Sequence, residues 1–266
     1  PDTTIISTAN SLYYSVVVGC GASTATSTAV LLNVNPALPA GNYTINQNLP
    51  TGGTNYNNFA AVRAALECGI TGPVVFDVVT GTGPYNEQFI LDSVRGASAI
   101  NTVTFNGNAN TIQYAPVLND ERAVIKLRRA DHIIFNNLVI NSVLPAALYA
   151  YGVQLINNAD SNVINNCTIL VADTITSTAY CGIVVNASEN NATTTGETQC
   201  DGNLFSSNII RGGYYGITLV GSTTTAVRSN NPNANSFNPY ENSNVIFGPI
   251  DKVIKMNIRD KGLDFT

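Results

Sequence analysis

The sequence has few charged residues, and this scarcity excludes several classes of protein. Charged residues make up 11% of the 266-residue chain, less than half of the roughly 25% that is typical of soluble domains. Long surface helices need Glu, Lys and Arg on their solvent faces, so a helix-rich fold is not expected. The 12 Lys and Arg residues form no basic run and the formal net charge is −5, so no nucleic-acid partner is expected.

The sequence also lacks the segments that would place it in a membrane. No stretch approaches the roughly 18 uninterrupted apolar residues of a membrane-spanning helix, so direct membrane insertion is not expected. Residues 1–10 show neither an initiator methionine nor a signal-peptide pattern. We therefore expect a piece of a longer chain whose targeting signals lie elsewhere.

The five cysteines are widely spaced and form no C-x-x-C pair, so a zinc site is not expected. Buried thiols, with or without one disulfide, fit this spacing. Polarity is supplied by Asn, Thr, Ser and Gly, and Asn alone occurs 36 times. Such a turn-rich composition with few charges is typical of a secreted or cell-surface protein.

Residues 11–35 predict two alternating β segments around a Gly-Ser-Thr turn. Two interpretations remain open. One is a small β-hairpin that packs on the following domain. The other is that residues 1–36 resemble the C-terminal part of an immunoglobulin-like module, which needs about 100 residues when complete. Residues 37–56, rich in Pro and Gly, predict a linker.

Residues 57–69 predict the one convincing helix of the chain. Its apolar residues fall on one face and are Phe59, Val62 and Leu66. Asn57 or Asn58 can cap its N-terminus, and Gly69 can end it. Short strands are expected from there onwards.

A repeat runs through the rest of the chain. Five segments align on a large apolar residue at their fifth position, at steps of 30, 29, 41 and 41 residues: NTVTFNG (101–107), DHIIFNN (131–137), DSNVINN (160–166), DGNLFSS (201–207) and NSNVIFG (242–248). Four of the five end in Gly or Asn, which tolerate positive φ, so we expect a sharp corner there. Phe135 is then expected in the core and Asn137 at the corner. Asn136 is expected to form a ladder with Asn106 and Asn165.

A glycine column supports the same repeat. Gly152, Gly182 and Gly216 each open an alternating apolar strand, so each coil contains three short strands. One coil cannot bury its own apolar face, but stacked coils share a core. The pattern predicts an all-β fold, a parallel β-helix of about five to six coils within 57–266. The boundaries that we expect are a capping helix at 57–69, coils at about 73–250, loops at 187–202 and 222–241, and an unassigned tail at 251–266.

Residues 57–91 resemble the start of pectin-lyase-like right-handed β-helix proteins, with a helix, a first strand and a G-x-Y-x-E turn at 83–87. With RGASAINTVTFNGN at 95–108, the chain also resembles large surface or secreted proteins of Bacteroidetes-type bacteria. Many of those leave by the type 9 secretion route and act as adhesins. The resemblance covers most of 1–250 and implies a right-handed β-helix, a secreted or cell-surface location, and secretion machinery as a partner.

One column of the repeat holds the best candidates for catalysis or metal binding. Its members are Asn101, Asp131, Asp160, Asp201 and Asn242. Carboxylates in register can bind Ca²⁺ or act as acid and base, whereas short side-chain acceptors can also bond backbone N–H groups. Asn and Asp interchange along the column, which favours the structural role. No other cofactor is expected, and Asp131, Asp160 and Asp201 remain the candidates for Ca²⁺.

The remaining ionisable residues do not form a recognisable catalytic motif. His132, the only histidine, occupies a small-polar position beside a corner. Arg128 and Arg129 can serve as a lyase-type base or uronate clamp, but one basic pair is more typical of solvated surface. Glu87 belongs to the G-x-Y-x-E turn. NIRDKG at 257–262 imitates the family's Arg-x-Lys motif without a paired Asp upstream, so no catalytic residue is assigned.

Five tyrosines near the glycine column are the candidate ligand-binding residues: Tyr149, Tyr151, Tyr180, Tyr214 and Tyr215. An exposed aromatic stripe suits sugar rings, and internal stacking at a corner is the alternative. The sequence as a whole favours a non-enzymatic structural or adhesin segment with carbohydrate as a candidate ligand. The alternative function is a carbohydrate-active enzyme, a polysaccharide lyase or glycoside hydrolase acting on acidic polysaccharide.

Overall fold

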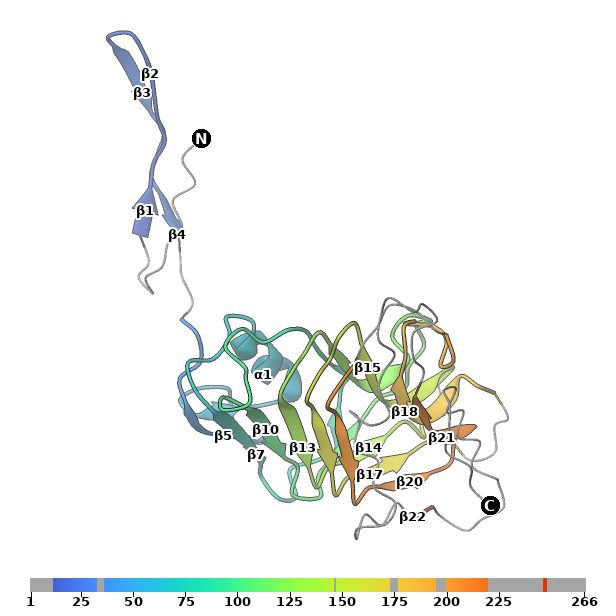
Figure 1. The fold of residues 1–266 in the computed structure, drawn as a ribbon. Helices are drawn as coiled ribbons and strands as arrows, with labels where there is room; N and C mark the ends of the chain where they lie inside the picture. The colour runs from blue at the N-terminus through green and yellow to red at the C-terminus, as the bar shows by residue number, and fades with distance from the viewer. Residues whose placement is uncertain are drawn as a thin grey trace.

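The chain forms a right-handed parallel β-solenoid of about six turns with very little helix (Figure 1). This confirms the expected all-β, parallel β-helical architecture. The structure is a computed structural model and describes residues 12–32, 36–145, 147–172, 177–194, 200–219 and 246–247. Within these ranges, no helix has both the length and the apolar character needed to cross a membrane.

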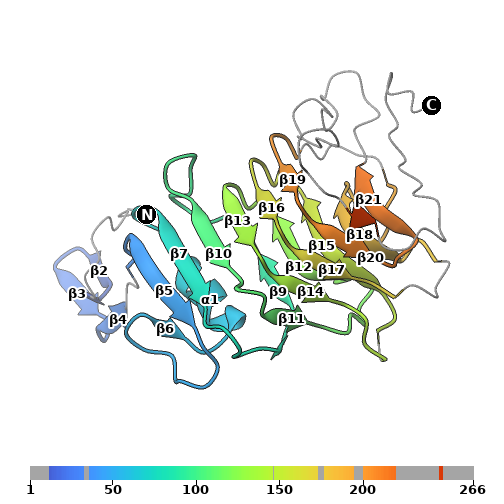
Figure 2. The same cartoon turned by 90° about the horizontal axis from the view of Figure 1, so that it is seen from below.

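Successive coils contribute one strand each to three parallel sheets, whose strands run side by side in Figure 2. Sheet 1 consists of β6 (Asn55–Tyr56), β5 (Gly41–Ile45), β7 (Val74–Val78), β10 (Val103–Asn106), β13 (Ile133–Asn136), β16 (Val163–Asn165) and β19 (Leu204–Ser206). Sheet 2 consists of β8 (Tyr85–Asn86), β11 (Thr111–Gln113), β14 (Val139–Asn141), β17 (Thr168–Leu170), β20 (Ile209–Arg211) and β22 (Ile246–Phe247). Sheet 3 consists of β9 (Phe89–Leu91), β12 (Ala123–Arg128), β15 (Ala150–Ile156), β18 (Tyr180–Val185) and β21 (Tyr215–Leu219).

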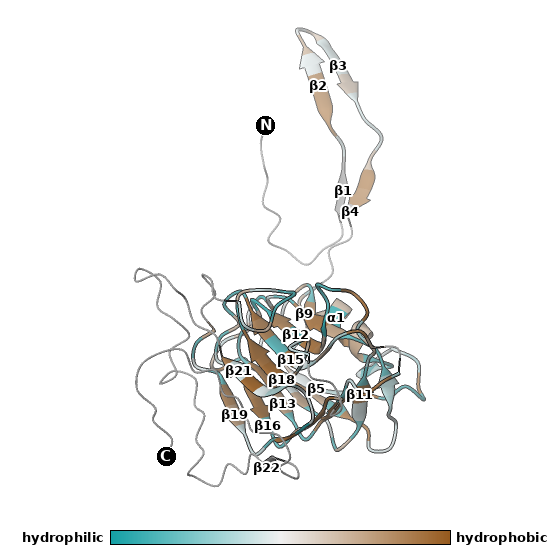
Figure 3. Cartoon of the chain, turned by 90° about the vertical axis from the view of Figure 1, so that its right-hand side faces the viewer, coloured by the Kyte–Doolittle hydropathy of each residue, from teal (hydrophilic) through white to brown (hydrophobic). Residues whose placement is uncertain are grey.

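The core lies inside the three sheets, whose strands are largely apolar (Figure 3). In sheet 1 alternate side chains point inward, as the period of two requires. Phe105 stacks on Phe76 with ring centroids 5.2 Å apart and on Phe135 at 4.9 Å. Phe135 is therefore in the core, as expected from the repeat.

Helix α1 (Phe59–Leu66) lies near the N-terminal end of the solenoid and packs against β9. Its side chains Phe59, Val62 and Leu66 are buried, which confirms the predicted apolar face. The Asn58 side chain accepts the N–H of Ala61 at 2.7 Å and caps the helix. The expected helix, 57–69, is longer than the observed one at both ends.

The predicted linker over 37–56 is wrong in part, because this stretch contains two strands of sheet 1. Strand β5 pairs in parallel with β7 from Gly41–Val74 to Ile45–Val78, and β6 pairs with β5. Tyr43 and Ile45 are buried, so β5 covers the edge of β7 and extends the core by one strand. The stacked coils thus begin before residue 73.

Residues 12–32 form an antiparallel ribbon that projects from the solenoid in Figure 1. Strand β1 (Leu12–Tyr14) pairs with β4 (Val30–Leu32), and β2 (Val17–Cys20) pairs with β3 (Ser23–Thr26). The described side chains of residues 15–31 are all exposed. The two β segments form as predicted, but the side chains of residues 15–31 do not pack on the following domain.

The asparagine corners have the expected left-handed backbone. The φ angles are 51° at Asn137, 52° at Asn166 and 54° at Ser207. Gly107 differs, because the left-handed angles of its corner fall on Asn108 and Ala109. A Cβ atom at Gly107 would lie 2.6 Å from the Asn137 carbonyl oxygen, so this glycine allows a close backbone approach.

The fifth segment of the repeat is aligned differently from the prediction. The column places Ile246 beside Phe205 in sheet 1, but Ile246 pairs with Ile209 and so extends sheet 2. The expected loop at 222–241 and the tail at 251–266 lie outside the described residues.

The left-handed corner gives a direct test by substitution. Asn137→Gly should leave the free energy of unfolding nearly unchanged, whereas Asn137→Val should lower it by about 1–2 kcal/mol, because a β-branched residue is strained at positive φ. Urea denaturation followed by circular dichroism measures both. Thr168→Val, in the extended strand β17, is the matched control and should be tolerated. Equal denaturation midpoints for Asn137→Val and the wild type would contradict the assigned corner.

Candidate functional site

The five candidate tyrosines do not form an exposed stripe. Tyr151 is 0% exposed, and Tyr180 and Tyr215 are 8% exposed. Tyr180 belongs to the main core, and its hydroxyl donates to the carbonyl of Ala147 at 3.2 Å. Tyr151 and Tyr215 lie in register with Cys181 between them on the outer face of sheet 3, in a second apolar cluster.

Tyr149 and Tyr214 are the two candidates that remain partly exposed. The guanidinium of Arg122 lies 4.3 Å from the centroid of the Tyr149 ring, a cation–π contact, and donates to the Tyr151 hydroxyl at 3.1 Å. The Tyr214 ring meets that of Tyr215 edge to face at 4.7 Å. Burial raises the pKa of Tyr151 to about 12, so its hydroxyl is a neutral hydrogen-bonding group at physiological pH.

The segment 186–194 covers the outer face of sheet 3 and explains the burial of Tyr151. Ala192 packs into the same apolar cluster. The amide Nε2 of Gln154 donates to Asn186 Oδ1 at 3.0 Å and to the carbonyl of Ser188 at 2.9 Å. This part of the expected loop at 187–202 is thus held to the sheet by polar contacts.

An ion-pair network fastens the same segment. Lys126 is 1% exposed, and its ammonium pairs with Glu189 and donates to the carbonyl of Asp120 at 2.5 Å. Lysine is almost never buried without such a partner. Arg128 pairs with Asp92 at 2.6 Å and with Glu189 at 3.7 Å. The hydrogen bond from Arg128 is the main reason that the pKa of Asp92 is lowered.

Each charged group of this network lies beside a group of opposite charge. The carboxylates of Asp92 and Glu189 both pair with cations. Arg128, a candidate base or uronate clamp, is one of those cations. Arg129 is exposed and has a φ of 55°.

Sequence reasoning missed Lys126 and Glu189. The available signal is the stretch AVIKLR, in which one lysine interrupts a buried strand. Glu189 lies 63 residues further along the chain, within the expected loop at 187–202. Nothing in the spacing identifies the two residues as partners.

The aspartate column acts on the backbone of the neighbouring coil. Asp131 Oδ1 accepts the N–H of Asp160 at 2.8 Å, and Asp160 Oδ1 accepts the N–H of Asp201 at 2.8 Å. Burial is the main reason that the pKa of Asp160 is raised, and the like charges of Asp131 and Asp201 act in the same direction. Within the described ranges, no three His, Cys, Asp or Glu side chains are grouped so as to hold a metal ion.

His132 and Glu87 have backbone roles. His132 has a φ of 59° and aligns with Ser161 and Gly202, which share left-handed angles. The carboxylate of Glu87 accepts the N–H groups of Phe59 and Ala60 at 2.9 and 2.8 Å, at the N-terminus of α1. Burial raises the pKa of Glu87, and these two hydrogen bonds act against that shift.

The cysteines form no disulfide in the described part of the chain, which includes all five. Burial raises the pKa of Cys167 to about 11 and that of Cys181 and Cys200 to about 12. These three thiols therefore stay protonated near neutral pH, as expected for structural cysteines. Cys20 is exposed and Cys68 is partly exposed.

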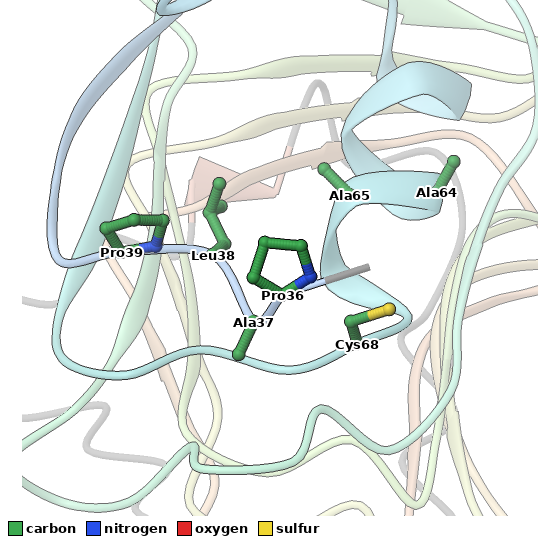
Figure 4. A pocket seen from close by; sticks show the side chains of 7 residues that line it. All are labelled: Pro36, Ala37, Leu38, Pro39, Ala64, Ala65 and Cys68. Atoms are coloured by element: carbon green, nitrogen blue, oxygen red, sulfur yellow. The ribbon is translucent and has the colours of Figure 1, made fainter. Parts of the chain in front are cut away.

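A hollow of about 270 Å³ lies between the chain at 36–39 and helix α1 (Figure 4). It is lined by Pro36, Ala37, Leu38, Pro39, Ala64, Ala65 and Cys68. Ligand sites combine an apolar lining with a few convergent polar groups that fix orientation. Apart from one thiol, this lining has no polar side chain, so only that thiol and backbone groups are present to orient a ligand.

Comparisons with protein-family models, with curated proteins and with solved structures found no match to this chain.

The aspartate column predicts opposite results for two substitutions at one position. Asp160→Ala should lower the free energy of unfolding by about 1–3 kcal/mol, because the N–H of Asp201 loses its acceptor. Asp160→Asn keeps an acceptor oxygen and removes a desolvated charge, so stability near pH 7 should be unchanged or higher. Urea denaturation at several pH values measures both.

The sign of the pH dependence follows from the raised pKa of Asp160. The folded protein holds this proton more tightly than the unfolded chain, so stability from this group falls as pH rises through the two pKa values. Asp160→Asn should remove that contribution. A Ca²⁺-dependent rise in the denaturation midpoint that disappears in Asp160→Asn would instead assign the column to cation binding.

Proposed function

We propose that this chain is a non-enzymatic structural and adhesive segment of a secreted or cell-surface protein, and that its ligand is carbohydrate. The observation that carries the proposal is that several carboxylates which could serve in catalysis already hold partners within the protein. Asp131, Asp160 and Glu87 accept backbone N–H groups, and Asp92 and Glu189 pair with cations. The solenoid then serves as a rod whose uncovered outer faces, such as that of sheet 1, are available for recognition.

We also propose that residues 12–32 belong to an immunoglobulin-like module and that helix α1 caps the solenoid. Two-stranded ribbons are marginal in water, yet Val16, Val17 and Val18 are each more than 60% exposed. An immunoglobulin-like module that includes residues 12–32 would cover them. Helix α1 buries its apolar face near the N-terminal end of the solenoid, which supports a role as the cap of a pectin-lyase-like β-helix.

The location and the secretion partner belong to the same proposal. Support comes from the 11% of charged residues, the 36 asparagines and the resemblance of residues 57–108 to secreted Bacteroidetes-type proteins. Export through the type 9 route would make the secretion machinery a transient partner.

The adhesive function predicts binding to glycans without turnover. On an array of neutral, acidic and amino-sugar glycans, the fluorescently labelled chain should be retained on at least one class after washing, and the retained glycan should keep its mass. A heat-denatured sample of the same chain is the control for non-specific retention. Loss of retention on every glycan class would overturn the proposal.

The second candidate function, an enzyme acting on acidic polysaccharide, is favoured by one observation. Asp92, Lys126, Arg128 and Glu189 cluster at the outer face of sheet 3, and arginine is suited to bind carboxylates.

The enzyme hypothesis is tested by incubation with polygalacturonate and alginate. We expect no ultraviolet absorbance from unsaturated sugars and no new reducing ends, because the four charges neutralise one another. Glu189→Gln is the matched variant, since it should abolish any genuine turnover and leave contaminating activity unchanged. Unsaturated products made by the wild type and not by Glu189→Gln would establish the enzyme.

A further inference from the structure

The strands of sheet 1 lie side by side (Figure 2), and their register forms two columns of outward residues across five coils. The first column is mainly aliphatic and consists of Val75, Thr104, Ile134, Val163 and Leu204. The second is polar and consists of Asp77, Asn106, Asn136, Asn165 and Ser206. All ten side chains are half-buried, so each presents part of its surface to solvent.

The polar column is a continuous hydrogen-bond ladder. Asn106 donates to Asp77 at 2.8 Å, Asn136 to Asn106 at 3.1 Å and Asn165 to Asn136 at 3.3 Å. Ser206 donates to Asn165 at 2.8 Å. These bonds confirm the expected ladder, and they fix the amide planes of three successive coils.

Each amide of the ladder retains capacity for a ligand. An asparagine side chain has two N–H donors and two acceptor lone pairs, and the ladder uses one of each at Asn106, Asn136 and Asn165. The same donor and acceptor therefore recur at three successive coils, at the inter-strand spacing of about 4.8 Å. A ligand that matches this repeat must itself be periodic.

The dimensions of the two columns favour a chain over a globular partner. Outward residues of one strand are about 6.6 Å apart, and five strands span about 19 Å. The strip thus covers on the order of 100 Å², whereas a stable protein interface buries about 800 Å² per partner. Its one charged residue, Asp77, would repel an acidic polymer rather than attract it.

We propose that the outer face of sheet 1 binds an extended neutral polysaccharide, with the C–H faces of the sugar rings on the aliphatic column and the hydroxyl groups on the amide ladder. This inference rests on the proposed function and gives it a site and a ligand class. It also relocates the glycan contact from the tyrosines, three of which are buried.

Affinity electrophoresis of the full 266-residue chain in gels containing galactomannan, xylan or hydroxyethyl cellulose tests the proposal. The wild type should be retarded by at least one of these neutral polymers and not by polygalacturonate. The double variant Ile134→Thr and Val163→Thr keeps β-branched side chains and removes aliphatic contact, so the dissociation constant should rise about tenfold.

Two further variants separate binding from folding. Thr104→Val fills the one polar gap in the aliphatic column and should tighten binding about threefold. Val139→Thr makes the same kind of change on the outer face of sheet 2 and should leave binding unchanged. Circular dichroism should give all variants the spectrum of the wild type.

The results of these experiments separate a failure of the sheet 1 site from a failure of the proposed function. Retardation that survives the double variant but is lost in Tyr149→Ala or Tyr214→Ala would overturn the sheet 1 site and leave glycan binding standing. Retardation by polygalacturonate alone would overturn the neutral ligand class. Retardation by none of the polymers, together with an empty glycan array, would overturn the proposed function itself.

Discussion

Each complete coil of the solenoid supplies one strand to each sheet, so the parallel register between coils decides which side chains meet. In sheet 1 this register places Phe135 on Phe105 at 4.9 Å and Asn136 beside Asn106. Because side chains alternate along a strand, a slip of one residue would turn Phe135 to solvent and Asn136 into the core. The left-handed corner at Asn137 limits such slips, since it ends each strand at the same place.

The periodic part of the structure could be predicted from the sequence because it recurs. Phe135, Asn136 and Asn137 each belong to a column of the repeat. A column shows which type of residue recurs at one position of successive coils, and a single residue cannot show this. Strand β5 was not predictable in this way, since its buried residues Tyr43 and Ile45 stand alone between Pro- and Gly-rich segments. Features that occur only once in the chain could not be predicted from the repeat.

The candidate site was much less predictable, because its contacts join segments that share no repeat. Lys126 and Glu189 are 63 residues apart, and neither has a counterpart in the next coil. The tyrosines recur near the glycine column, but recurrence does not reveal that the segment 186–194 covers Tyr151. Composition and spacing identify which residues are candidates, whereas exposure depends on how the loops lie.

The backbone hydrogen bonds of the three sheets all run along the stacking axis, because each strand bonds to strands of adjacent coils. A bending force on the rod would be shared by three sheets at once. Tension along the axis would instead load the coils in series, so that the interface with the weakest contacts opens first. Side-chain ladders bridge successive coils of sheet 1 along this same direction, and they would therefore carry part of any tension applied along the stacking axis.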